Sequence, residues 1–106
     1  MHNSELWLVM PVHNEKTVLA QTLKDVFEHI DNVIVVDDGS FDGSGEIAVL
    51  AGAHMLRHHF NLGQGAALQT GIDYAARMGA RYVVTFDADG QHPYEKIPIF
   101  LKKLEK

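Results

Sequence analysis

Alternation between short apolar runs and segments of helical periodicity constrains the fold of this chain more than any other feature. The runs are apolar along most of their length, which is typical of strands that are covered on both faces. We expect strands at Leu6–Met10, Val33–Val36, Met55–His58 and Tyr82–Phe86, with Pro11 closing the first. Strands that alternate with helices favour a parallel sheet with crossover helices on both faces. The sequence therefore predicts an α/β fold of about four strand-helix units.

The intervening segments carry apolar residues three and four positions apart, as amphipathic helices do. We expect helices at Thr17–Ile30, Ser44–Ala51 and Gln64–Met78, the last two ending at Gly52 and Gly79. The expected buried face of the third helix comprises Leu68, Ile72, Ala75 and Ala76. A fourth helix is expected from about Glu95, with an apolar face of Ile97, Phe100, Leu101 and Leu104 and a polar face of Lys102, Lys103, Glu105 and Lys106.

Composition excludes several classes of protein. The 106 residues are enough for one compact domain, and 46% hydrophobic with 22% charged residues excludes a wholly disordered chain. A net charge of −5 argues against nucleic acid as a partner. The absence of cysteine excludes disulfides and zinc-thiolate sites. Since the sequence shows neither a signal peptide nor an apolar run near the ~20 residues of a membrane span, we expect a cytoplasmic location.

Acidic and polar clusters follow three of the four expected strands. They are PVHNE at 11–15, DDGS at 37–40 and DADGQH at 87–92. Ligands of open parallel sheets bind outside the carboxyl ends of the strands, so the clusters are expected to converge on one crevice. Gly90 allows a turn that can bring Asp87 and Asp89 towards one divalent cation. A D-x-D pair alone is weak evidence, because aspartate is also common in ordinary turns.

Other interpretations of these clusters are less consistent with the spacing. A calcium loop starting at Asp87 would need glycine and glutamate where the chain has His92 and Pro98. The glycine fingerprint of nicotinamide-binding proteins is missing after the first strand. A phosphate-receiver domain would carry its acidic pair after the first strand, whereas Asp37 and Asp38 follow the second. The segment at 61–65 that opens the third helix could attract a phosphate or could serve only as a cap.

The histidines offer little support for a metal site. No helical H-x-x-x-H or H-E-x-x-H pattern is present, and His58 and His59 are adjacent, so they tend to point apart on a strand. We interpret His54, His58 and His59 as structural or surface residues. His13 and His92 are different, because both belong to the strand-end clusters.

Taken in order, four stretches resemble the donor-binding half of family 2 glycosyltransferases, enzymes of the Rossmann-like GT-A nucleotide-diphospho-sugar fold. The stretches are PVHNE, VVDDGS, NLGQGAALQTGI and FDADGQHP, and they span nearly the whole chain. The form DADGQHP is most similar to members that transfer a sugar to a polyprenyl phosphate, such as dolichyl-phosphate mannose synthase. The resemblance implies that residues 1–106 are the nucleotide-sugar-binding N-terminal portion of a longer enzyme.

The resemblance also implies roles for individual residues. His13 stands where the family more often has tyrosine or arginine, and the general base would lie outside this chain. The divalent metal, Mg²⁺ or Mn²⁺, would be held against the donor diphosphate by Asp87, Asp89 and Gln91. The nucleotide-sugar would be bound by Pro11, Val12, His13, Glu15, Asp37, Asp38, Asp87 and Ala88.

The expected function is transfer of a sugar from a UDP- or GDP-linked donor to a polyprenyl phosphate or a growing glycan. Parts of the enzyme beyond this chain would hold it at the cytoplasmic face of the membrane. Self-association as a homo-oligomer stays open. Two alternatives remain at this point: a catalytically silent nucleotide-binding or assembly module, and, less favoured, a receiver-type phosphotransfer domain.

Overall fold

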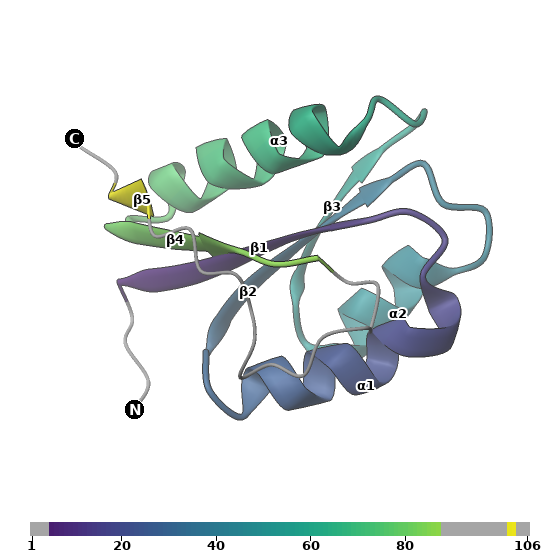
Figure 1. The fold of residues 1–106 in the computed structure, drawn as a ribbon, viewed down its shortest axis with the longest axis horizontal. Coiled ribbons are helices and arrows are strands. Elements are labelled where there is room, and N and C mark those ends of the chain that lie inside the picture. The colour runs from purple at the N-terminus through teal and green to yellow at the C-terminus, as the bar shows by residue number, and fades with distance from the viewer. Residues whose placement is uncertain (1–4, 88–101, 104–106) are drawn as a thin grey trace.

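A five-stranded sheet forms the centre of the computed structural model, which describes residues 5–87 and 102–103. The strand order is β3-β2-β1-β4-β5. Helices α1 and α2 lie on one face of the sheet and α3 lies on the other (Figure 1). The expected α/β fold class is confirmed. The elements are β1 (Leu6–Val12), α1 (Lys16–Phe27), β2 (Asn32–Asp38), α2 (Ser44–Ala51), β3 (His54–His58), α3 (Gln64–Arg77), β4 (Tyr82–Thr85) and β5 (Lys102–Lys103).

Side chains that alternate along β1 and β2 divide the core into two layers. On the α1 and α2 side, Leu8 and Met10 pack with Leu19 and Leu23. On the α3 side, Trp7, Val9, Ile34 and Val36 pack with Ala67 and Ala75, and Leu68 and Ile72 are partly buried against them. A side chain at position 71 would collide with Val9, so Gly71 allows α3 to lie close against the sheet.

The expectation that Pro11 closes the first strand is wrong, since β1 continues to Val12 and Pro11 pairs with Val36 of β2. Main-chain groups of alternate residues in a strand face the same neighbour. Because the carbonyl of Val9 accepts from the amide of Phe86, the main chain of Pro11 also faces the β4 side. Strand β4 has already ended there at Thr85, so the missing N–H of proline removes no ladder bond.

The end of the chain also differs from expectation. Lys102 and Lys103 form β5, which pairs antiparallel with Val83 and Tyr82, whereas the sequence predicted a helix there. The outer edge of β4 carries main-chain donors and acceptors that a strand can satisfy and a helix cannot. The sheet is therefore mixed rather than wholly parallel. The expected apolar residues Ile97, Phe100, Leu101 and Leu104 lie outside the described residues.

Four parallel strands, β1 to β4, bring their carboxyl ends to one edge of the sheet. The loop at 13–15, the loops at 39–43 and 59–63 and Asp87 follow these ends, so all gather at that edge. Across residues 5–87 and 102–103, none of the helices combines the length and the apolar character that a membrane crossing would require.

Candidate functional site

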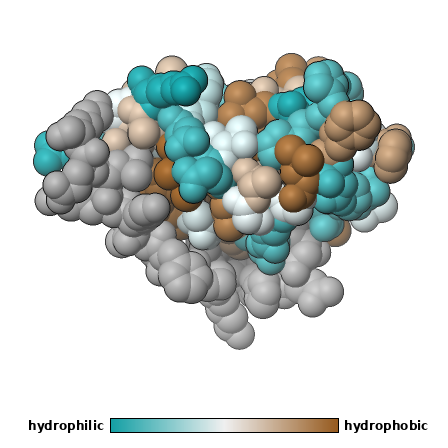
Figure 2. All heavy atoms as spheres, turned by 90° about the horizontal axis from the view of Figure 1, so that it is seen from above, coloured by the Kyte–Doolittle hydropathy of each residue, from teal (hydrophilic) through white to brown (hydrophobic). Residues whose placement is uncertain are grey.

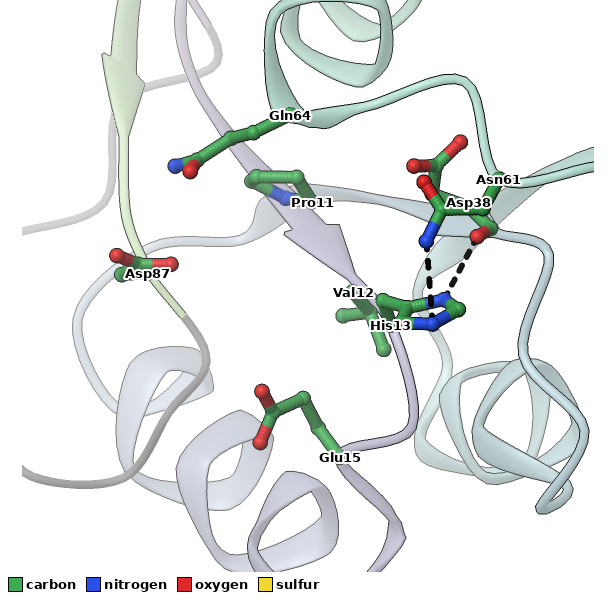
Figure 3. A pocket seen from close by; sticks show the side chains of 8 residues that line it. All are labelled: Pro11, Val12, His13, Glu15, Asp38, Asn61, Gln64 and Asp87. Carbon is green, nitrogen blue, oxygen red and sulfur yellow. Dashed lines mark hydrogen bonds between the residues drawn. The ribbon is translucent and has the colours of Figure 1, made fainter.

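A pocket of about 200 Å³ opens at the carboxyl edge of the sheet. Figure 3 shows Glu15, Gln64 and Asp87 around its open centre and His13, Asn61 and Asp38 together on one side. Six of the residues that the sequence predicted for nucleotide-sugar binding are brought together here. The lining consists of Pro11, Val12, His13, Glu15, Asp38, Asn61, Gln64 and Asp87.

The loop that carries His13 and Glu15 is held by the loop that follows β2. Asn14 adopts a left-handed conformation with a φ of 56°, and its side-chain oxygen accepts the amide of Phe41 at 2.8 Å. Three successive main-chain amides donate to side chains of the loop after β2 and of Ser44, the first residue of α2, so the start of α1 is capped by another part of the chain rather than by its own residues. The pairs are Asn14 with Ser40 at 2.9 Å, Glu15 with Ser44 at 3.0 Å and Lys16 with Asp42 at 3.0 Å.

The carboxylate of Asp38 accepts three hydrogen bonds. The amides of Leu62 and Gly63 donate at 2.9 and 2.8 Å, and Nδ1 of His58 lies 2.8 Å from Oδ1. Burial acts to raise the pKa of Asp38, but the bonds from Leu62, His58 and Gly63 outweigh it, so the pKa lies below its ordinary value. Asp38 is therefore a fixed, ionised acceptor on the pocket wall.

These contacts account for two of the main-chain amides in the segment at 61–65, which the sequence suggested as a phosphate site or a cap. The amides of Leu62 and Gly63, at the entrance to α3, already donate to Asp38. They are therefore engaged by a protein carboxylate rather than free to receive a phosphate.

The ring of His13 is oriented by three contacts. Nδ1 lies 2.9 Å from the main-chain carbonyl oxygen of Asp38, and because a carbonyl only accepts, Nδ1 carries the hydrogen. Nε2 lies 3.1 Å from the side-chain nitrogen of Asn61 and 3.3 Å from that of Asn14, and both of these amide groups donate to it. The neutral tautomer with hydrogen on Nδ1 fits all three contacts, of which Figure 3 draws those to Asp38 and Asn61.

Asp37 does not line this pocket. Neighbouring residues of a strand point to opposite faces, so the side chain of Asp37 lies on the α2 side of the sheet and that of Asp38 on the α3 side. The carboxylate of Asp37 accepts from the Ser40 amide at 3.0 Å and from Nε of Arg57 at 3.3 Å. A side chain at Gly45 would collide with both partners of this ion pair.

The proposed metal ligands are only partly described. Asp87 is exposed and lines the pocket, while Asp89, Gln91 and Ala88 lie outside the described residues. Within the described part of the chain, no three histidine, cysteine or acidic side chains are grouped so that they could hold a metal ion. Three acidic residues, Glu15, Asp38 and Asp87, line the pocket, and Figure 3 shows them apart from one another.

Apolar side chains are exposed beside the pocket. Phe41, on the loop after β2, is 93% exposed, and Phe60 and Leu62, on the loop after β3, are 76% and 61% exposed. Figure 2 shows apolar atoms among polar ones on the α3 side of the surface. These loops offer apolar area next to the pocket, and self-association through such area stays a prediction.

Sequence reasoning missed three contributors to the site. His58 was interpreted as a structural or surface residue, yet it contacts Asp38. Asn61 and Gln64 were considered only within the segment that opens the third helix, as a cap or an attractor of phosphate, yet both line the pocket. A signal for His58 was present in retrospect, because the residue ends a strand beside the Asp38 strand end. Strand pairing places the two residues directly opposite each other.

A family comparison identifies the chain. The family model described as Glycosyl transferase family 2 matches residues 7–106. The chain belongs to glycosyl transferase family 2. The resemblance drawn from the four motifs is confirmed, and membership of this family decides against the phosphate-receiver hypothesis.

Two relatives show how much of a family 2 protein this chain represents. An uncharacterized protein of Methanocaldococcus jannaschii is 43% identical over 93 residues, which cover 87% of this chain and 38% of the relative. The UDP-N-acetylglucosamine–dolichyl-phosphate N-acetylglucosaminyltransferase of Methanococcus voltae is 32% identical over 119 residues, which cover 92% of this chain and 46% of that enzyme. The chain thus spans less than half the length of these relatives.

A solved structure shares the fold of this family 2 chain. Glucosyl-3-phosphoglycerate synthase from Mycobacterium tuberculosis, in complex with Mn²⁺, UDP and glucosyl-3-phosphoglycerate, superposes with a TM-score of 0.59 at 23% identity. The match covers 78% of this chain and 33% of that one. It confirms the GT-A fold that the resemblance implied.

Proposed function

We propose that residues 1–106 form the donor-binding portion of a glycosyltransferase and that the pocket receives a nucleotide-diphospho-sugar. The observation that carries this proposal is the convergence of Glu15, Asp38 and Asp87, from three different strand ends, on one pocket in a family 2 chain. Carboxylates in such a pocket accept hydrogen bonds from nucleoside N–H and O–H groups and can hold a cation beside a diphosphate.

The two sides of the pocket favour one orientation of the donor. Asp38 and His13 lie together on one side, and Asp87 lies across the open centre (Figure 3). An ionised acceptor held by three donors suits the base or ribose, so the nucleoside would lie against Asp38 and His13. The diphosphate would then lie towards Asp87. UDP-linked and GDP-linked sugars are the candidate donors, and the name of the Methanococcus voltae relative includes a UDP-sugar.

The donor set fits a hard divalent cation such as Mg²⁺ or Mn²⁺. Mg²⁺ commonly binds one or two protein carboxylates and completes its coordination with substrate phosphates and water, so a pocket whose described residues form no three-residue cluster is compatible with it. Asp87, with Asp89 and Gln91, would hold the ion. When bound, the ion would neutralise charge that develops on the leaving diphosphate. Without it, Glu15 and Asp87 would repel the donor.

A polyprenyl phosphate is the proposed acceptor. The Methanococcus voltae relative is named for dolichyl phosphate. A phosphate acceptor is already ionised at neutral pH, so it needs little help from a general base. The residues that bind the acceptor would lie outside this chain and would place it at the cytoplasmic face of the membrane. Nucleotide binding without any sugar transfer by the whole protein would instead favour a catalytically silent binding module.

Calorimetric titration tests the donor pocket directly. We expect UDP or GDP to bind in the presence of Mn²⁺ and to bind at least tenfold more weakly after Asp87→Asn, since one ligand to the ion is lost. Asp73→Asn is the matched control, because Asp73 is exposed on α3 and its carboxylate contacts Gln69. Absence of nucleotide binding, or equal loss in both variants, would overturn the proposal.

A further inference from the structure

The imidazole of His58, the last residue of β3, bridges β2 and α3. Its Nδ1 lies 2.8 Å from Oδ1 of Asp38, and its Nε2 lies 2.9 Å from the hydroxyl oxygen of Thr70 on α3. The side chain of His58 is only 12% exposed, and that of Asp38 is 5% exposed. Both ring nitrogens are therefore engaged inside the protein, and the ring is fixed at both ends.

The chemistry of the two partners sets the direction of these hydrogen bonds. An ionised carboxylate only accepts, so Nδ1 of His58 carries the hydrogen and donates to Asp38. In the neutral imidazole Nε2 is then the acceptor, and the hydroxyl of Thr70 donates to it. Asp38 thus selects the tautomer of His58, and the hydroxyl of Thr70 satisfies the remaining ring nitrogen.

This chain of contacts determines what remains of Asp38 for a ligand. A carboxylate offers about four acceptor positions. His58 and the Leu62 amide occupy Oδ1, and the Gly63 amide occupies one position of Oδ2. Among the described residues, no group donates to the second position of Oδ2, and Asp38 lines the pocket. The carboxylate of Asp38 therefore keeps one acceptor position for a ligand.

We propose that His58, supported by Thr70, is a positioning residue that orients Asp38 to accept one hydrogen bond from the nucleoside of the donor. This inference rests on the proposed function of the pocket. The group that faces Asp38 must be a donor, such as the ring N–H of uracil or guanine or a ribose hydroxyl. His58 itself does not line the pocket, so it acts through Asp38.

A role confined to stability would look different in a binding experiment. His58 also helps to hold the loop at 59–63, because Asp38 binds the amides of Leu62 and Gly63. If His58 only stabilised this loop, its loss would lower the free energy of unfolding and weaken every ligand by a similar factor. A positioning role instead confines the loss to ligands that carry a nucleoside.

Four variants of the full chain separate these roles. The nucleotide probe is UDP or GDP, whichever the wild type binds more tightly, and pyrophosphate binding is measured by displacement. All measurements contain Mn²⁺. We expect His58→Ala to weaken nucleotide binding about tenfold, near the lower end of what one charge-assisted hydrogen bond contributes, and to leave pyrophosphate binding unchanged. His58→Asn, whose amide can take the place of Nδ1–H, restores most of the nucleotide affinity. Thr70→Val weakens it about threefold, and the exposed neighbour His59→Ala leaves it unchanged.

The outcomes separate failure of this inference from failure of the proposed function. A wild-type chain that binds neither UDP nor GDP overturns the donor pocket, and the role of His58 with it, before any substitution is made. Wild-type binding that survives His58→Ala, or an equal loss for nucleotide and pyrophosphate, overturns the positioning role alone. If circular dichroism shows that His58→Ala does not fold, His58→Asn and Thr70→Val test the positioning role instead. Full nucleotide affinity in Thr70→Val together with reduced nucleotide affinity in His58→Asn would contradict the proposed chain of contacts.

Discussion

Asp37 and Asp38 are adjacent at the end of one strand, yet their surroundings differ completely. Asp37 lies on the α2 side, where it forms an ion pair with Arg57, which also binds Glu46. Asp38 lies on the α3 side, where two amides and a histidine hold it at the wall of a pocket. The comparison teaches that two adjacent acids can have different roles. The carboxylate of Asp37 stabilises the loop after β2 and, through Arg57, helix α2. The carboxylate of Asp38 lies at the pocket, where it can bind a ligand.

Asp38→Asn should have the largest effect on both stability and nucleotide affinity. The amide group of asparagine would direct hydrogens at the N–H donors of Leu62 or Gly63, or at His58, so at least one buried donor would lose its acceptor. We expect the free energy of unfolding to fall by about 2 kcal/mol and nucleotide affinity to fall about a hundredfold. Urea denaturation and calorimetry measure the two effects. Unchanged nucleotide affinity in Asp38→Asn would contradict the proposal that Asp38 binds the nucleotide.

The contribution of the Asp38 carboxylate to the free energy of unfolding should depend on pH. The folded-state pKa of Asp38 lies below its ordinary value of 3.8, so the protein gains stability from this group above that value and loses it as pH falls through the lower, folded-state pKa. We expect the stability difference between wild type and Asp38→Asn to shrink as the pH is lowered below about 4. Urea midpoints measured at neutral and acid pH test this, and a difference that grows towards acid pH would contradict the sign.

Asp37→Asn should reduce stability modestly and leave nucleotide affinity almost unchanged, in contrast to Asp38→Asn. Removal of the charge weakens the contact with Arg57, whose side chain is 42% exposed, so the loss of stability should be modest, about 1 kcal/mol. Nucleotide affinity should stay within about twofold of the wild type, because Asp37 does not line the pocket. A tenfold loss of affinity would mean that the Asp37 side takes part in binding.

Gly45→Ala should have the smallest effect, a small loss of stability with no change in nucleotide affinity. Its methyl group would displace the guanidinium of Arg57 and press on the carboxylate of Asp37, both of which can move, so we expect a loss of up to about 1 kcal/mol and no change in nucleotide affinity. Gly65→Ala is the matched control, since its methyl group would meet no atom within 4 Å and alanine favours the helix. Thermal unfolding of the two variants should therefore shift in opposite directions.

The sequence predicted the fold well where side-chain burial alone decides structure. The continuous apolar run at 33–36 and the helix at 44–51 that ends at Gly52 both lie in elements of the expected kind. Main-chain pairing is less visible in a sequence. The continuation of β1 through Pro11 depends on where β4 ends, and the strand at Lys102 depends on an open edge of the sheet, neither of which periodicity records.

The candidate site was predicted in outline and missed in its supporting contacts. Strand ends in an open parallel sheet meet at one edge, so the grouping of His13, Glu15, Asp38 and Asp87 followed from their positions. Their roles in binding stay predictions. The separation of Asp37 from Asp38 follows from the alternation of side chains along a strand, which the resemblance to a motif obscured. The contact of His58 with Asp38 depends on the pairing of β2 with β3.

An amide NMR titration with UDP or GDP and Mg²⁺ tests most directly whether the Asp38 side, rather than the Asp37 side, binds the nucleotide. We expect the largest shifts at His13, Asn61, Leu62 and Gly63, whose groups surround Asp38, and little change at Gly45 and Glu46 on the other face. Shifts centred on Gly45 and Glu46, or no shifts at saturating nucleotide, would contradict the account.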